Sequence, residues 1–173
     1  MKFNLTQAIE ILERTPSTLG TLLDGLSEEW TGNNEGEESW SPYDVVGHLI
    51  HGEKTDWIKR LEIVLADGGS KIFEPFDRFA QFEESKGKTL NQLLAEFKDI
   101  RTENLQYLKS KNLNRNDFEK VGIHPALGEA TLENLLSTWV VHDLNHLSKI
   151  SRVMAKQYKN SVGPWVEYLP ILK

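Results

Sequence analysis

Apolar residues recur at three- and four-residue steps in four long stretches of this chain, a spacing that places them on one face of an α-helix. The first stretch runs from about Leu5 to Leu26. Pro16 interrupts it, which predicts a kink or a restart near Thr15, because proline cannot donate the helical hydrogen bond. The polar segment 31–37 that follows is typical of a surface loop, and the acids within 35–38 are interpreted as solvated.

Capping residues mark where the other three helices are expected to begin. The second helix is expected to start after Ser41, with Pro42 at its first position and Asp44 at the capping-box position, and to end near residue 67. Thr89 and Thr131 are the corresponding caps of the third and fourth helices, which are expected to end near residues 108 and 158.

Two long joins separate the later helices, at 71–88 and 112–128. The first contains four phenylalanines and is expected to cross the bundle with short helical turns. No stretch of the chain shows the alternation of a β-strand with turn residues around it. The pattern therefore predicts an all-α fold, a four-helix bundle with long connections.

The most conspicuous chemistry lies late in the fourth helix, at His142 and His146. Residues four apart share a helix face, and Trp139 and Ile150 continue this face, which predicts two inward-facing imidazoles. Buried imidazoles are costly without a partner, and a divalent metal suits this spacing. The alternative is a pair of core histidines that are hydrogen-bonded to backbone or carboxylate groups.

His48 in the second helix is the third candidate ligand, with Gly47 and Gly52 beside it to allow close approach of another backbone or a ligand. Bundles readily combine one ligand from one helix with an i,i+4 pair from another. Three neutral imidazoles around Zn²⁺, or a similar metal such as Ni²⁺, leave a position open for water or substrate, as in catalytic sites. By itself His48 would be interpreted as a core residue, so its assignment depends on the pair.

His51 and Asp143 are candidate catalytic residues that could handle protons. His51 lies one turn from His48 and is interpreted as a residue at the rim or behind the ligands. Asp143 stands where zinc proteases of the His-Glu-x-x-His type have a glutamate, and its shorter side chain, together with the lack of an expected sheet, disfavours a protease. Asp44 could orient His48 but is more simply a helix cap, and His124 is expected to have a local structural role.

Composition limits the classes of function. The 173 residues suffice for a single domain, 1–173, and the net charge of −6 disfavours a nucleic-acid partner. No apolar run is long enough to span a membrane, and no signal-peptide pattern is present, so we expect a cytoplasmic protein without a membrane partner. Since the chain has no cysteine, any reacting thiol must arrive on a substrate.

Several motifs resemble the DinB-like family. Segment 40–49 is similar to the opening of the family's second helix, and segment 124–132, followed by Trp139 and the histidine pair, is similar to its late helix. Residues 76–79 and 88–90 add weaker similarity, so the resemblance covers most of the chain in the same order. It implies an up-down-down-up bundle, often dimeric, with a divalent metal held by three histidines, here His48, His142 and His146.

The resemblance also implies a range of activities, because family members include transferases and isomerases that use low-molecular-weight thiols, and others described as metal-dependent hydrolases. The leading hypothesis is a transferase that joins a small thiol to an electrophile, with the metal stabilising the thiolate. A hydrolase that activates water at the same site is the first alternative. A non-catalytic metal-binding stress-response protein is the second. We also expect a homodimer, which apolar aromatic side chains on the outer helix faces would suit.

Overall fold

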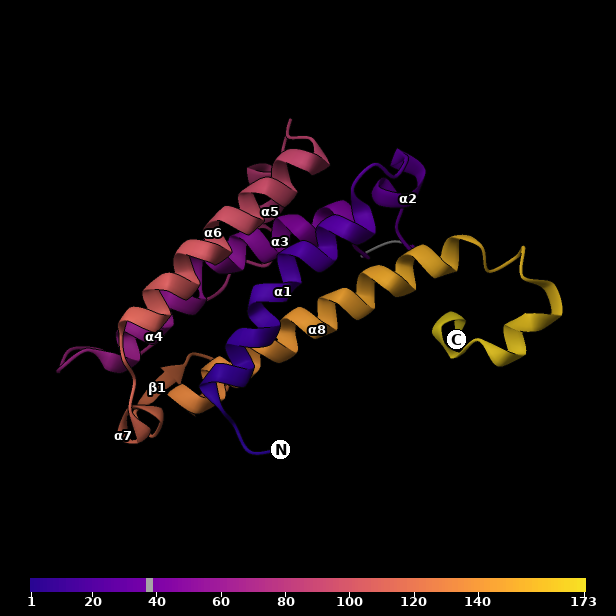
Figure 1. Cartoon of the computed structure of the whole chain (residues 1–173). Coiled ribbons are helices and arrows are strands. Elements are labelled where there is room, and N and C mark those ends of the chain that lie inside the picture. Colours follow the sequence, from indigo (N-terminus) through magenta and orange to yellow (C-terminus); the bar gives the residue numbers. More distant parts are fainter. Residues whose placement is uncertain (37–38) are drawn as a thin grey trace.

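The computed structural model describes residues 1–36 and 39–173, so Glu37 and Glu38 of the expected surface loop lie outside the described residues. Its long elements are α1 (Leu5–Leu23), α3 (Pro42–Thr55), α4 (Trp57–Leu65), α6 (Leu90–Ser110) and α8 (Leu132–Gln157). In Figure 1, α1 and α8 run in one direction, whereas α6 and the pair α3–α4 run in the other. The expected four-helix bundle in up-down-down-up order is thus confirmed.

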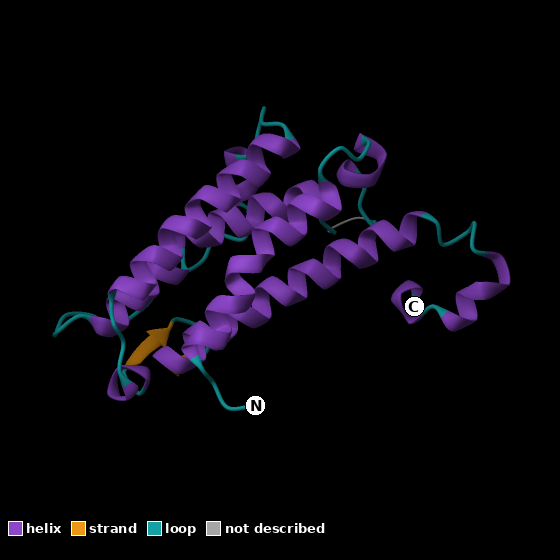
Figure 2. Ribbon diagram, in the orientation of Figure 1, coloured by secondary structure: helices purple, strands orange, loops and turns teal. Residues whose placement is uncertain are grey.

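Short elements occupy the connections and the C-terminal tail (Figure 2). They are α2 (Glu28–Gly32), α5 (Ala80–Glu84), α7 (Arg115–Phe118) and the 3₁₀ turns η1 (Gly163–Tyr168) and η2 (Pro170–Leu172). Because α2 includes residues 31 and 32, the predicted surface loop begins two residues later than expected. Helix α5 packs against α3, as expected for a join that crosses the bundle. No helix among the described residues combines the length and apolarity that crossing a membrane requires.

The prediction that the chain contains no strands is wrong. Strands β1 (Val121–His124) and β2 (Gly128–Thr131) pair in an antiparallel hairpin just before α8. Each strand has only four residues, too few for an alternating pattern to stand out in the sequence. The turn depends on His124, whose Nδ1 accepts hydrogen bonds from the backbone N–H groups of Ala126 and Leu127, both at 3.2 Å. His124 therefore has the local structural role that the sequence indicated.

The helix starts follow the local capping signals. Ser41 and Asp44 form a reciprocal capping box at the start of α3, and Thr89 and Thr131 cap α6 and α8. The expected second helix is divided at Asp56, whose backbone departs from helical geometry (φ −115°, ψ −72°). Backbone hydrogen bonds nevertheless continue through this residue, so α3 and α4 act as one arm of the bundle.

Helix α1 continues through Pro16, so the predicted restart near Thr15 does not occur. A proline at this position leaves the carbonyl of Leu12, four residues earlier, without its helical donor. That carbonyl instead accepts a hydrogen bond of 2.8 Å from Nη1 of Arg101 in α6. A local defect of α1 is therefore compensated by a long-range contact.

Two apolar clusters form the core of the described residues. One surrounds Leu12, Trp57 and Trp139 near the hairpin end, and the other surrounds Leu19 and Phe97 near the opposite end. Between them along the helices lie buried polar groups, which belong to the site described next.

Candidate metal centre

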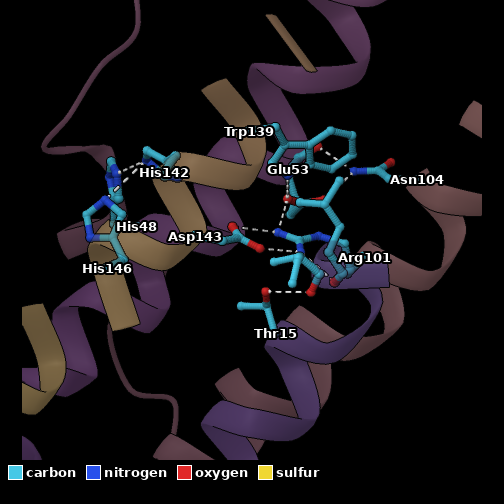
Figure 3. A network of polar contacts seen from close by, with 11 residues as sticks. Thr15, His48, Glu53, Arg101, Asn104, Trp139, His142, Asp143 and His146 are labelled. Atoms are coloured by element: carbon cyan, nitrogen blue, oxygen red, sulfur yellow. Dashed lines mark hydrogen bonds and ion pairs between the residues drawn. The ribbon is translucent and has the colours of Figure 1, made fainter. Parts of the chain in front are cut away.

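Three imidazoles meet in the middle of the bundle, His48 from α3 and the pair His142 and His146 from α8 (Figure 3). Nε2 of His142 lies 3.1 Å from Nε2 of His48 and 3.1 Å from Nε2 of His146. The nitrogens that the three rings offer all lie within 4.8 Å of one another. The structure thus brings together the three residues that the sequence indicated as candidate metal ligands.

The arrangement of these nitrogens fits a metal ion better than a hydrogen-bonded cluster. Nitrogens bound tetrahedrally to Zn²⁺ at their usual distance are about 3.3 Å from each other, close to the observed separations. An imidazole nitrogen carries either one hydrogen or one lone pair, yet Nε2 of His142 faces two other Nε2 atoms at equal distance. Three lone pairs directed at one cation satisfy this geometry, whereas two full hydrogen bonds at that nitrogen do not.

The environment keeps the imidazoles in the neutral form that binds metals. Burial, reinforced by neighbouring imidazoles, lowers the pKa of His48 to about 3 and that of His146 to about 2. Burial also lowers the pKa of His142 to about 4, although the adjacent Asp143 carboxylate opposes this shift. Near neutral pH all three rings therefore offer lone pairs.

Aromatic packing orients the three rings. Metal-binding histidines usually donate their second ring N–H to a carboxylate or carbonyl, but the Nδ1 atoms here are buried without a hydrogen-bond partner in the described part of the chain. Instead, the rings pack against two tryptophans. Between ring centres, Trp40 is 4.7 Å from His48 and 6.4 Å from His146, to which its ring is nearly parallel. The centre of the Trp57 ring is 5.2 Å from that of His142. Asp44 does not orient His48, because its carboxylate accepts from the N–H and hydroxyl of Ser41.

His51 lies one turn from His48 and belongs to a different contact. It is buried, and its Nδ1 is 2.9 Å from Oε1 of Glu84 in α5. Helix α5 can approach α3 this closely because Gly47 has no side chain: a Cβ there would lie 2.4 Å from Oγ of Ser85. Gly47 thus serves helix packing.

A buried ionic network lies on the other side of α8 (Figure 3). Arg101, which is 1 % exposed, donates to both oxygens of Asp143 at 2.6 and 3.0 Å and to Oε1 of Glu53 at 2.8 Å. Glu53 also accepts from the indole of Trp139 and the amide of Asn104. Burial raises the pKa of Glu53, and Arg101 opposes this. The network joins α1, α3, α6 and α8 at the level of the histidines.

Asp143, the candidate general base, is part of this ionic network. Its side chain is fully buried, and both of its oxygens face Arg101, away from the three imidazoles (Figure 3). The geometry favours a structural role, because a base must reach the proton that it removes. Sequence reasoning missed Arg101 and Glu53. The available signal was a charged residue at an apolar-stripe position, since Arg101 falls four residues after Phe97 and four before Leu105.

The three imidazoles form part of the wall of a cavity of about 520 Å³. Helix α8 provides one long side of it, from Asn134 and Thr138, past the histidines, to Asn145 and Lys149. The cavity therefore extends along α8 on both sides of the candidate metal site, and its size suits a small organic ligand. A metal at this place would be accessible to substrates.

Known proteins were compared with this chain by sequence and by structure. No curated protein sequence matches this chain significantly. Among solved structures, this chain is similar to YfiT from Bacillus subtilis, with a TM-score of 0.72 and 21 % sequence identity. The match covers 91 % of this chain and 87 % of the YfiT chain. YfiT is described as a probable metal-dependent hydrolase with an unusual four-helix bundle topology. At this identity the likeness shows the fold. The family model of the DinB superfamily matches residues 11–150, which include all three histidines. The chain belongs to the DinB superfamily.

Proposed function

We propose that this protein is a metal-dependent enzyme that holds Zn²⁺ or Ni²⁺ at His48, His142 and His146 and joins a low-molecular-weight thiol to an electrophilic small molecule. The observation that carries the proposal is the convergence of three neutral imidazole nitrogens on the wall of a cavity that admits small molecules. A divalent metal bound there would lower the pKa of an incoming thiol and so make a nucleophile available near neutral pH.

The protein's own residues supply binding and orientation. The histidines come from two helices and leave the cavity side of the site open. Trp40 and Trp57 orient the three rings by packing. The cavity continues along α8 in both directions from the imidazoles, which favours a reaction between two small molecules, one on each side. Because the chain has no cysteine, the thiol is a substrate.

The catalytic roles predicted for His51 and Asp143 stay predictions. His51 is paired with Glu84, whose side chain is partly exposed, so this pair could exchange protons with solvent. A pH–rate profile of His51→Gln tests this role: the profile should lose one limb, while metal content stays unchanged. A wild-type profile would contradict it.

Hydrolysis at the same site is the second candidate, supported by the description of YfiT as a probable metal-dependent hydrolase. A paired screen separates the two reactions. The metal-loaded protein is incubated with a panel of small thiols and aromatic halide acceptors, and in parallel with ester and amide substrates. Thiol-dependent turnover that disappears in His142→Ala supports transfer. Turnover of esters or amides without thiol supports hydrolysis.

A non-catalytic metal-binding protein remains the third possibility. Metal removal that unfolds the bundle, with no turnover in either screen, would support it.

We further propose one domain over 1–173, a homodimer and a cytoplasmic location. The exposed Trp165 and Tyr168 side chains in η1 provide apolar surface for self-association. Light scattering of the purified protein measures the oligomeric state directly.

A further inference from the structure

We propose that the end of the cavity formed by Trp40, Arg78 and Lys149 binds an anionic group, so that the ligand delivered to the three histidines carries a carboxylate or a phosphate. This inference rests on the proposed function for the role of the site. The binding of the anion itself requires only the cationic side chains and can be tested without metal.

The two cations lie directly on the aromatic ring that holds the histidines. Nζ of Lys149 is 4.4 Å from the centre of the Trp40 ring, and the guanidinium carbon of Arg78 is 5.7 Å from it. The same ring packs against His48 and His146. All of these residues line one cavity, so a group bound by either cation inside it lies near the candidate metal ligands.

The charges in the cavity are unbalanced. Among the described residues, its wall contains three cationic side chains, Arg60, Arg78 and Lys149, and one acid, Asp56. Asp56 is already paired with Arg60 at 2.5 Å. Across residues 1–36 and 39–173, neither Arg78 nor Lys149 has a carboxylate within ion-pair distance. Within the part of the chain that the structure describes, these two cations lack an ion-pair partner, and in a protein of net charge −6 they form a local anion-attracting site.

Burial and the nearby charges of Arg152 and Arg78 lower the pKa of Lys149, although the carboxylates of Glu35 and Asp44 oppose this shift. Cation–π contact with an indole stabilises such cations but leaves their hydrogens free to donate to an anion. The amide of Asn145, one turn before Lys149 on the same wall, is a further polar group for that anion.

The distance to the histidines suits a small molecule. Lys149 follows His146 by three residues, which is about 4.5 Å along the axis of α8. A ligand anchored by an anionic group at this end can therefore extend a reactive group to the imidazoles. The opposite end, beside the hairpin, remains available for the second reactant.

The test uses inorganic phosphate and succinate as probes, with the uncharged succinamide as the neutral control. The protein is titrated as purified and again after dialysis against 1,10-phenanthroline, an uncharged chelator that does not itself occupy an anion site. The readout is the indole N–H signal of Trp40 in ¹H–¹⁵N NMR spectra, assigned with Trp40→Phe. Arg78→Gln and Lys149→Gln are compared with Lys159→Gln, which removes an exposed lysine outside the cavity.

We expect saturable shifts of the Trp40 signal with at least one of the two anions and none with succinamide. Arg78→Gln and Lys149→Gln should each weaken that binding by about fivefold or more, the effect of losing one charged contact, and Lys159→Gln should not. Binding of phosphate alone or succinate alone identifies the anionic group of the ligand. Absence of saturable binding, equal binding of succinamide, or wild-type affinity in both cavity variants would overturn the proposal. Anion binding by a protein that holds no metal would contradict the proposed function and leave this inference standing.

Discussion

Replacement of Arg101 by methionine tests whether the buried ionic network holds the bundle together. In Arg101→Met the side chains of Glu53 and Asp143, both fully buried, lose the cation between them. The Leu12 carbonyl, which Pro16 deprives of a helical donor, also loses its partner. The hydrophobic stem of the arginine is largely retained by methionine, so the change mainly removes charge and hydrogen bonds.

The expected loss is large. Removing one partner of a buried ion pair costs about 3–5 kcal/mol, because an uncompensated charge stays in the interior. Part of this cost is relieved when one of the two carboxyl groups takes up a proton. We therefore expect the free energy of unfolding of Arg101→Met to fall by about 3 kcal/mol or more at pH 7, and the deficit to shrink at lower pH as protonation becomes easier.

Urea denaturation followed by far-UV circular dichroism measures this loss, provided that the slope of the transition is unchanged between variants. Lys98→Met is the matched control, because it removes an exposed cation from the same helix and should change stability by less than about 0.5 kcal/mol. The triple variant Arg101→Met, Glu53→Gln and Asp143→Asn should be more stable than Arg101→Met, since it contains no unpaired buried charge. If Arg101→Met is as stable as the wild type, the network does not stabilise the fold and this reasoning is wrong.

Two further predictions follow from α1 and from the histidines. A proline inside a helix usually costs about 3 kcal/mol. Pro16→Ala should nevertheless stabilise the protein by less than about 1 kcal/mol in thermal or urea unfolding, because Arg101 already satisfies the Leu12 carbonyl. A gain in stability near about 3 kcal/mol would contradict this account. The pKa values of His48 and His142 in the folded protein, about 3 and 4, lie below the value of about 6.5 expected in the unfolded chain. The unfolded chain therefore binds more protons at these histidines in this range, and each of them should lower the stability of the metal-free protein as the pH falls from about 6.5 towards 4, by up to about 1.4 kcal/mol per pH unit. Burial raises the pKa of Asp56 to about 6, so uptake of a proton by this carboxylate opposes part of the loss. Comparison with His48→Gln isolates one imidazole: if this variant has the same pH dependence as the wild type, the His48 ring is not buried in neutral form.

Helix positions could be predicted from the sequence because their signals are local. The capping boxes at Ser41, Thr89 and Thr131 act within one helical turn, and the structure starts α3, α6 and α8 there. The hairpin was not predictable in the same way. Its strands are short, and Gly122 packs where a Cβ would lie 2.3 Å from the Phe73 ring, a contact between segments far apart in the chain.

The candidate site also contains residues with a local sequence signal and residues whose position depends on long-range packing. The spacing of His142 and His146 on one helix gave a local reason to place both imidazoles together. The position of His48 against them depends on how α3 packs on α8, for which the chain contains no local signal. The surroundings of Asp143 could not be predicted from the motif: its carboxylate contacts Arg101, and only the folded bundle reveals that this arginine is buried.

Elemental analysis of the purified protein by inductively coupled plasma mass spectrometry tests the three-histidine metal centre most directly. The wild type should contain about one divalent metal ion per chain, since three imidazoles define one site. His48→Ala and His142→Ala should each lose most of it, although they change different helices. His124→Ala, which alters a histidine of the same cavity outside the cluster, should keep it. A wild type without stoichiometric metal, or a His48→Ala variant that binds metal as the wild type does, would contradict the proposed centre.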